Sequence, residues 1–272
     1  MAAESLQYTD TSDPTRCIDE LHGLRDLVDN EWVLRVDHAL VNAHVRQKEW
    51  RLALVSLDNM LKRVETLPNH NAFQSELYSR QGRILLQAGA IPQARIVFDR
   101  AQKAGNAQQE RPTDLSSSSL SSWIVKRIPC QLAMNDGLHS FATAKYDDAL
   151  SFFQKATDAL REVKVPGDKY CRDNYMGTFW VDSHGFVSTQ AWNNMALSAL
   201  YTCQMKDAVE KMETLIREDP TAHLTERLAF NLCTLYELGA DTAASARKKR
   251  VLQLVAKRFF LHDIGPESFR LG

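Results

Sequence analysis

The stretch from Ser75 to Gly105 restricts the possible folds of this chain more than any other part of the sequence. In its first half, Tyr78, Gly82 and Leu85 follow one another at spacings of four and three, which puts them on one face of a helix. A second helix is expected to begin at Pro92, because the first turn of a helix has unpaired amides and tolerates proline. The stretch therefore predicts two helices folded against each other.

Small and large side chains are combined in this predicted helix pair. Gly82 and Ala94 have little side-chain bulk where the two helices would cross, whereas Tyr78 and Phe98 supply large apolar groups. This combination is typical of the tetratricopeptide repeat (TPR), a helix pair that recurs with a period of about 34 residues. One pair cannot bury its own apolar face, so neighbouring pairs are needed to complete a core.

Related patterns recur along the chain and predict an all-α fold, namely a TPR-like α-solenoid of about five helix pairs with helical caps and two inserted loops. Residues 1–14 are polar and are expected to be frayed, while residues 15–272 are expected to form a single solenoid domain. An apolar stripe that starts at Ile18 is expected to form the N-terminal cap. The small residue of the second helix in successive pairs is Ala53, Ala94, Ala149 and Ala208.

Two segments interrupt the repeat and are predicted to be inserted loops. Residues 104–129 are polar and rich in serine, so they cannot fill a core, although the apolar residues that close the segment are expected to begin the next helix. A phosphorylated serine tract is the functional alternative. Residues 163–190 combine Pro and Gly with the aromatic Tyr175, Phe179 and Trp180. These rings either pack back onto the repeats or bind a partner, since Tyr and Trp are enriched in binding hot spots.

The composition and the motifs argue against an enzyme, a cofactor and nucleic-acid binding. Lys plus Arg number 33 and Asp plus Glu 34, so the chain lacks the basic excess that favours nucleic acid. It contains no Gly-rich phosphate loop, no H-E-x-x-H zinc motif and no G-x-S-x-G nucleophile elbow. The cysteines are scattered, which predicts buried thiols and no metal site. His44 and His139 are expected to be structural.

The chain is expected to be a soluble, cytoplasmic protein without an integral membrane segment. No run approaches the roughly 18 apolar residues of a membrane span, and the N-terminus lacks the basic and apolar regions of a secretory signal. The basic run Arg247–Arg250 is expected to be a solvated face, and an acidic protein partner or an anionic membrane surface are the alternatives.

In a TPR-like solenoid the first helices of the pairs line a groove that can hold a protein partner. A TPR co-chaperone would bind an acidic peptide there through Lys, Arg and Asn, but Arg83 is nearly alone among the expected groove residues. We therefore place this function second to a scaffold that binds other proteins. The predicted partner-binding residues on the first helices are Glu76, Ser79, Arg83, Gln190, Asn193, Leu197, Glu226, Ala229 and Cys233.

Three segments carry a resemblance to a known family, namely Gly82–Lys103, Trp192–Pro220 and Glu226–Ala256. The last is the most specific, because the TPR pattern does not itself require FNLCTLYEL followed by a short turn and a basic helix. On these residues the sequence resembles the C-terminal TPR region of subunit 12 of the trafficking protein particle (TRAPP) complex. The aromatic insert at 163–190 replaces what is usually a short turn in that family.

The resemblance implies a non-catalytic scaffold subunit of a TRAPP vesicle-tethering complex. Such a subunit binds other TRAPP subunits and acts in transport from the endoplasmic reticulum (ER) to the Golgi and in autophagy. It would be cytoplasmic and peripheral at ER and Golgi membranes, held there only through the complex. Nucleotide exchange on Rab-type GTPases is promoted by other subunits of that assembly.

Overall fold

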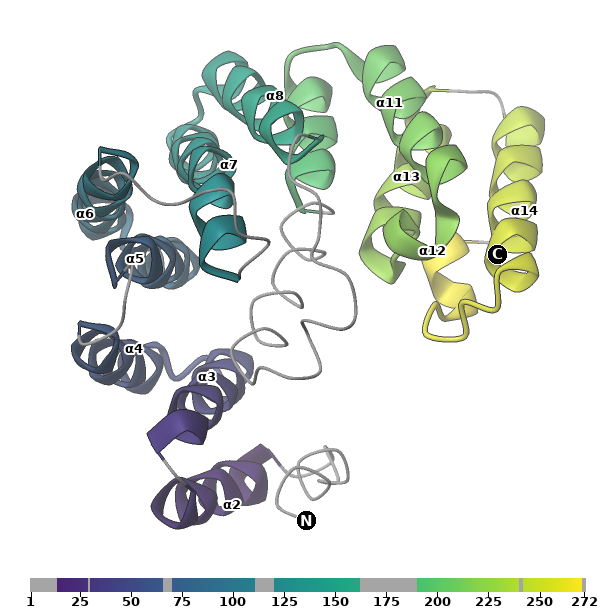
Figure 1. Cartoon of the computed structure of the whole chain (residues 1–272). Helices are drawn as coiled ribbons and strands as arrows, with labels where there is room; N and C mark the ends of the chain where they lie inside the picture. The colour runs from purple at the N-terminus through teal and green to yellow at the C-terminus, as the bar shows by residue number, and fades with distance from the viewer. Residues whose placement is uncertain are drawn as a thin grey trace. The chain divides into compact units, whose positions relative to one another are not determined.

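All regular secondary structure in the described part of the chain is helical, and no strand occurs there (Figure 1). This confirms the all-α prediction. The predictions for the N-terminal residues 1–13, for the middle of the Ser-rich segment and for the aromatic residues of 163–189 lie outside the described residues. The computed structural model describes residues 14–28, 30–65, 70–110, 120–161, 190–239 and 242–270.

The chain divides into two compact units, and the division falls between Asn135 and Asp136 within one helix, α7. In the first unit each helix contacts the next one along the chain from α2 to α6. Leu57, Met60 and Leu77 lie fully inside its main core, to which α3, α4, α5 and α7 all contribute. The helices of this unit are α2 (Pro14–Leu27), α3 (Asn30–Arg46), α4 (Trp50–Val64), α5 (His70–Gln87), α6 (Ile91–Gln109) and the N-terminal part of α7 (Leu120–Ala142).

The second unit contains the end of α7 and the helices that follow it. The rings of Phe141, Tyr146 and Tyr201 pack together where three of these helices end or begin, with Tyr146 and Tyr201 stacked at a centroid distance of 4.4 Å. α13 contacts α11, α14 and η1, so it is the central helix of the C-terminal part. The elements are α8 (Tyr146–Arg161), helical residues 190–201, α11 (Met205–Glu218), α12 (Pro220–His223), α13 (Glu226–Gly239), α14 (Thr242–Arg258) and the 3₁₀ helix η1 (Pro266–Phe269).

The predicted close crossing at Gly82 is present between α5 and α6. A Cβ atom placed on Gly82 would lie 2.2 Å from Cε1 of Phe98, far closer than the usual carbon contact of about 3.5–4.0 Å. The α7–α8 pair repeats this packing, since a Cβ on Gly137 would lie 2.6 Å from Cε1 of Phe153. Glycine is therefore required at both crossings by the aromatic ring that covers it.

The helix pairs also share one turn geometry. In the α5–α6 turn Gly89 has a φ of 80°, and the Ala90 amide donates to the Leu85 carbonyl at 2.8 Å. A left-handed residue followed by this 6→1 hydrogen bond is the Schellman motif, which satisfies the last carbonyls of a helix. The same pattern of bonds and positive φ recurs in turns where the left-handed residue is Lys48, Ala144, Cys203 and Phe260.

Helices extend into the predicted insert of residues 104–129 from both sides, as expected for the apolar residues that close the segment but not for its first residues. α6 continues to Gln109, because Ala101, Gly105 and Gln108 form a buried stripe on one face of this helix. A Cβ on Gly105 would lie 2.8 Å from Cγ2 of Ile128, so the stripe packs closely against α7. Since α7 begins at Leu120, the predicted insert of residues 104–129 is helical over much of its length.

The two ends of the described chain differ in how well the apolar pattern predicted them. The predicted apolar stripe of the N-terminal cap, Ile18, Leu21, Leu24, Leu27 and Val28, is only partly buried, because Leu21 of α2 packs against α3 but Leu27 is 83% exposed. After α14 the chain turns back, and Ile264 and Phe269 are buried on or near η1.

None of the described helices is both long and apolar enough to cross a membrane.

Candidate functional site

A row of polar side chains connects the helices α3, α5 and α7 of the first unit. The Arg83 guanidinium lies 3.4 Å from the Glu76 carboxylate, and both side chains project from α5. The Gln131 amide of α7 donates to Glu76 at 3.3 Å and accepts from Arg83. Arg80 donates to the Asn42 amide oxygen on α3 at 2.6 Å. These five residues are called the polar strip below.

The cations of the polar strip are poorly solvated. Burial lowers the pKa of Arg83, although the charge of Glu76 and its hydrogen bond act in the opposite direction. Burial likewise lowers the pKa of Arg80, to about 9. Arg127 of α7 is buried and its charge lowers the pKa of Arg83 further. A partner that binds here therefore has to replace contacts that the strip already makes within the chain.

Glu76 and Arg83 are partly accessible, whereas the structure corrects the expected place of Ser79. The Ser79 side chain is completely buried. Its hydroxyl donates to the Ser75 carbonyl at 2.7 Å and accepts from the Asn135 amide at 2.7 Å. Ser79 therefore holds α5 against α7 and does not face a groove.

In the second unit the predicted residues separate into a buried and an accessible group. Ala229 and Cys233 are fully buried, and burial raises the pKa of the Cys233 thiol to about 11. Asn193 is 6% exposed and accepts a hydrogen bond from the Asn231 amide of α13. The expectation that these three side chains face a partner is wrong, because α13 is covered on several sides by α11, α14 and η1. Gln190, Leu197 and Glu226 remain at least partly exposed.

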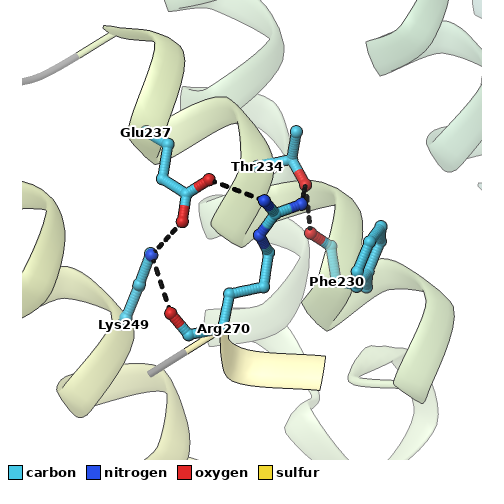
Figure 2. Close-up of polar contacts among 5 residues, drawn as sticks. All are labelled: Phe230, Thr234, Glu237, Lys249 and Arg270. Carbon is cyan, nitrogen blue, oxygen red and sulfur yellow. Dashed lines mark hydrogen bonds and ion pairs between the residues drawn. The ribbon is translucent and has the colours of Figure 1, made fainter. Parts of the chain in front are cut away.

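A group of contacts that the sequence did not suggest joins α13, α14 and the C-terminal segment (Figure 2). Arg270 lies 3.1 Å from the Glu237 carboxylate, donates to the Thr234 hydroxyl at 3.1 Å and stacks over the Phe230 ring. Lys249 is buried, pairs with Glu237 and donates to the Arg270 carbonyl at 3.0 Å. We call these five residues the C-terminal clasp.

The clasp explains why α13 offers less free surface than predicted. Its two cations approach one carboxylate from different elements, and they lower the pKa of Glu237, mainly through the hydrogen bond from Lys249. Arg270 lies beyond the last helix of the repeat pattern, in a left-handed conformation with a φ of 47°. No periodic signal in the sequence could have assigned it a partner on α13.

A hollow of about 320 Å³ lies between α11, α13 and α14. Its lining combines the apolar Leu232, Tyr236 and Val251 with the cations Arg247 and Lys248. The sequence indicated the basic run on α14 but not the hollow, because three helices have to come together to form it.

No group of three or more His, Cys, Asp or Glu side chains among the described residues is arranged to hold a metal ion. His44 has the structural role predicted for it, since its Nδ1 lies 2.8 Å from the Glu49 carboxylate across the α3–α4 turn.

Comparison with known proteins gives two kinds of similarity. The chain is 25% identical over 218 residues to the trafficking protein particle complex subunit 12 of Homo sapiens, and 26% identical over 225 residues to that of Mus musculus. These alignments include 80% and 82% of this chain, but only 23% and 22% of the relatives. A comparison with known protein families finds no match.

The fold itself is similar to the crystal structure of BtubC (BKLC) from P. vanneervenii. The TM-score is 0.54 at 13% sequence identity, over 93% of this chain and 91% of the other. At this identity the likeness concerns the fold alone. The sequence similarity to the two subunits supports a relationship to a TRAPP subunit, and this chain spans less than a quarter of their length.

Proposed function

We propose that this chain is a TPR-like α-solenoid that acts as a non-catalytic scaffold in a TRAPP-related vesicle-tethering assembly, in ER-to-Golgi transport and autophagy. The similarity to TRAPP subunit 12 over 218 residues carries the proposal. The glycine–phenylalanine crossings and the shared turns support the TPR-like part of it, because they recur in successive helix pairs. The chain would be cytoplasmic and would reach ER and Golgi membranes through its partners.

The mechanism is rigid presentation of side chains without a reaction. Helix pairs whose ends are fixed by Schellman turns hold exposed residues at defined positions, so little conformational entropy is lost on binding. A carboxylate-clamp type of co-chaperone site is less well supported, because the guanidiniums of the polar strip already bind Asn42, Glu76 and Gln131. The accessible candidates for contacts with other TRAPP subunits are Glu76, Arg83, Gln190, Leu197 and Glu226, together with Tyr175, Phe179 and Trp180 outside the described residues.

Co-purification tests this function. The tagged chain is expressed in cells, and the recovered proteins are identified by mass spectrometry against a tag-only control. We expect enrichment of several TRAPP subunits. Failure to enrich any of them would contradict the proposed scaffold role.

Variants that reverse a charge or shorten a side chain to alanine then test the predicted partner-binding residues. Glu226→Arg and the double variant Phe179→Ala/Trp180→Ala are each expected to reduce recovery of TRAPP subunits while circular dichroism keeps the helical signal. Arg51→Glu, at an exposed position of α4, serves as the control and should recover them normally. Unchanged recovery with both test variants would remove these residues from the binding surface.

A further inference from the structure

The groove between α11, α13 and α14 has the size and the lining of a binding site for side chains. Its volume of about 320 Å³ is within the range of roughly 300–1,000 Å³ found for ligand pockets. The floor includes Ile216, Leu232 and Leu252, which are at most 6% exposed and fix the shape of the groove. The groove is therefore a hollow with an apolar floor supported by three helices.

Exposed apolar side chains extend from the groove along the outer face of α14. Val251 lines the groove and is 57% exposed, and Leu254, one turn further on, is 61% exposed. Val251 and Leu254 therefore present exposed apolar groups beside the groove, and an exposed apolar patch marks an interaction surface more often than a single exposed residue does.

Positive charge surrounds this apolar surface. α14 has the sequence TAASARKKRVLQLVAKR, which contains Lys and Arg but no Asp or Glu. Arg247, Arg250 and Arg258 are all exposed on it. The two remaining cations of the helix outside the clasp, Lys248 and Lys257, are exposed as well.

The acidic residue in the groove lining, Glu213, does not neutralise this charge. Its carboxylate lies 2.9 Å from Lys248 and 2.8 Å from Arg217, and it accepts a hydrogen bond from the Tyr236 hydroxyl at 3.0 Å. Two cations therefore share one carboxylate, and Arg247 adds a further positive charge to the same lining. A ligand that brings negative charge would complement the groove.

We propose that the α11–α13–α14 groove binds an acidic peptide segment of a protein partner, which inserts apolar side chains between Val251 and Leu232 and places carboxylates beside Arg247 and Arg250. A bilayer fits less well, because the apolar floor lies in a hollow between helices and a flat surface does not reach it. This inference goes beyond the proposed scaffold function, and it does not depend on whether the partner is a TRAPP subunit.

A second hollow in the same unit has a lining of the opposite charge. It has a volume of about 280 Å³ and is lined by Trp192 together with Asp207, Glu210 and Glu218. Because this hollow is acidic and the α14 groove is basic, peptides of opposite charge should distinguish them. An acidic peptide is expected to bind at α14 and a basic peptide is not.

The test uses a fluorescein-labelled synthetic peptide in which Leu recurs at helical i, i+3, i+4 and i+7 spacing and Glu fills most other positions. Fluorescence anisotropy measures its binding to the whole chain at low and at physiological salt. We expect the peptide to bind more than about 10-fold tighter than a version with Lys in place of Glu, or a version with Ala in place of Leu, and salt to weaken the binding.

Two double variants locate the site, and in each of them the two changed residues stand four positions apart on one helix. Arg247→Glu/Val251→Glu on α14 is expected to weaken binding of the Glu/Leu peptide at least about 10-fold. The matched control is Arg51→Glu/Val55→Glu on α4, where an exposed cation and an exposed valine stand four positions apart in the same way. If the first variant fails to fold by circular dichroism, Arg247→Gln/Arg250→Gln removes charge only and should still weaken binding about 3–10-fold.

Several results would overturn the proposal. Equal binding of the Glu/Leu and Lys/Leu peptides, with both weakened by the α14 variant, would show that charge does not select the ligand of this groove. Equal loss in the α4 and α14 variants, or no loss in the α14 variants, would show that the groove is not the site. Co-sedimentation of the chain with phosphatidylserine vesicles, without binding of the Glu/Leu peptide, would assign the surface to a membrane instead. None of these outcomes bears on co-purification with TRAPP subunits, so the two proposals fail separately.

Discussion

Replacing Gly82 with alanine is expected to destabilise the first unit, because the new methyl group has no space. Its carbon would lie 2.2, 2.4 and 2.8 Å from three atoms of the Phe98 ring, so the ring has to move by more than about 1 Å to restore ordinary contact. Phe98 is 2% exposed, and its neighbours have to move with it. Overpacking of this kind costs about 1–3 kcal/mol, of which the better helix propensity of alanine recovers up to about 1 kcal/mol.

Urea denaturation followed by circular dichroism measures this effect. We expect the free energy of unfolding to fall by about 1–2 kcal/mol, which corresponds to a decrease in Tm of a few degrees, roughly 2–8 °C. Gly23→Ala is the matched control, because Gly23 is an exposed helical glycine and a Cβ there meets nothing within 4 Å. That variant should be stabilised by about 0.5–1 kcal/mol through helix propensity alone.

A double-mutant cycle with Phe98→Leu tests whether the ring is the cause. Phe98→Leu destabilises by itself through loss of buried apolar surface. In its background Gly82→Ala should become nearly neutral, so the coupling energy between the two positions is expected to be about 1–2 kcal/mol. Additive effects, or a Gly82→Ala variant as stable as the wild type, would refute the steric explanation.

Three further predictions concern the turns, the pH dependence and the clasp. Gly89→Ala should destabilise by about 1 kcal/mol and Ala144→Gly should stabilise by about 0.5–1 kcal/mol in urea denaturation, because both positions are left-handed and a Cβ is unfavourable there. Burial holds the pKa of His38 well below 6.5, so the unfolded chain gains a proton first on acidification. Lowering the pH from 7.5 to 5.5 should therefore reduce stability by up to about 1.4 kcal/mol through this residue, and His38→Gln should lose that part of the pH dependence in thermal melts. Arg270→Ala should lower Tm and speed amide hydrogen exchange in α13, whereas unchanged exchange would show that the clasp does not stabilise that helix.

Local sequence patterns predicted the packing within single helix pairs well. Gly82, Ala94 and Phe98 stand at fixed spacings, and two neighbouring helices are enough to determine their contact. The turns were harder to predict. A glycine such as Gly89 indicates a left-handed conformation in the sequence, whereas Ala144 and Cys203 adopt this conformation although neither is a glycine.

Which face of a helix remains accessible could not be predicted from periodicity. Cys233 is on the face expected to meet a partner, yet it is buried because η1 and α14 pack against α13. Ser79 is buried for a similar reason, since Asn135 of α7 reaches its hydroxyl. Both outcomes depend on segments distant in sequence. The groove beside α14 was missed for the same reason, although its cations were visible as a basic run.

The C-terminal clasp has a practical consequence for attaching fluorescent labels to this protein. Arg270 uses its main-chain carbonyl as well as its guanidinium, so substitution of the side chain removes only part of its attachment. A dye attached to a cysteine at position 270 would therefore remove the guanidinium contacts with Glu237 and Thr234 but keep the main-chain carbonyl as an acceptor for Lys249. Labels for interaction studies are better attached at exposed positions away from the five clasp residues, where they leave α13 and its neighbours undisturbed.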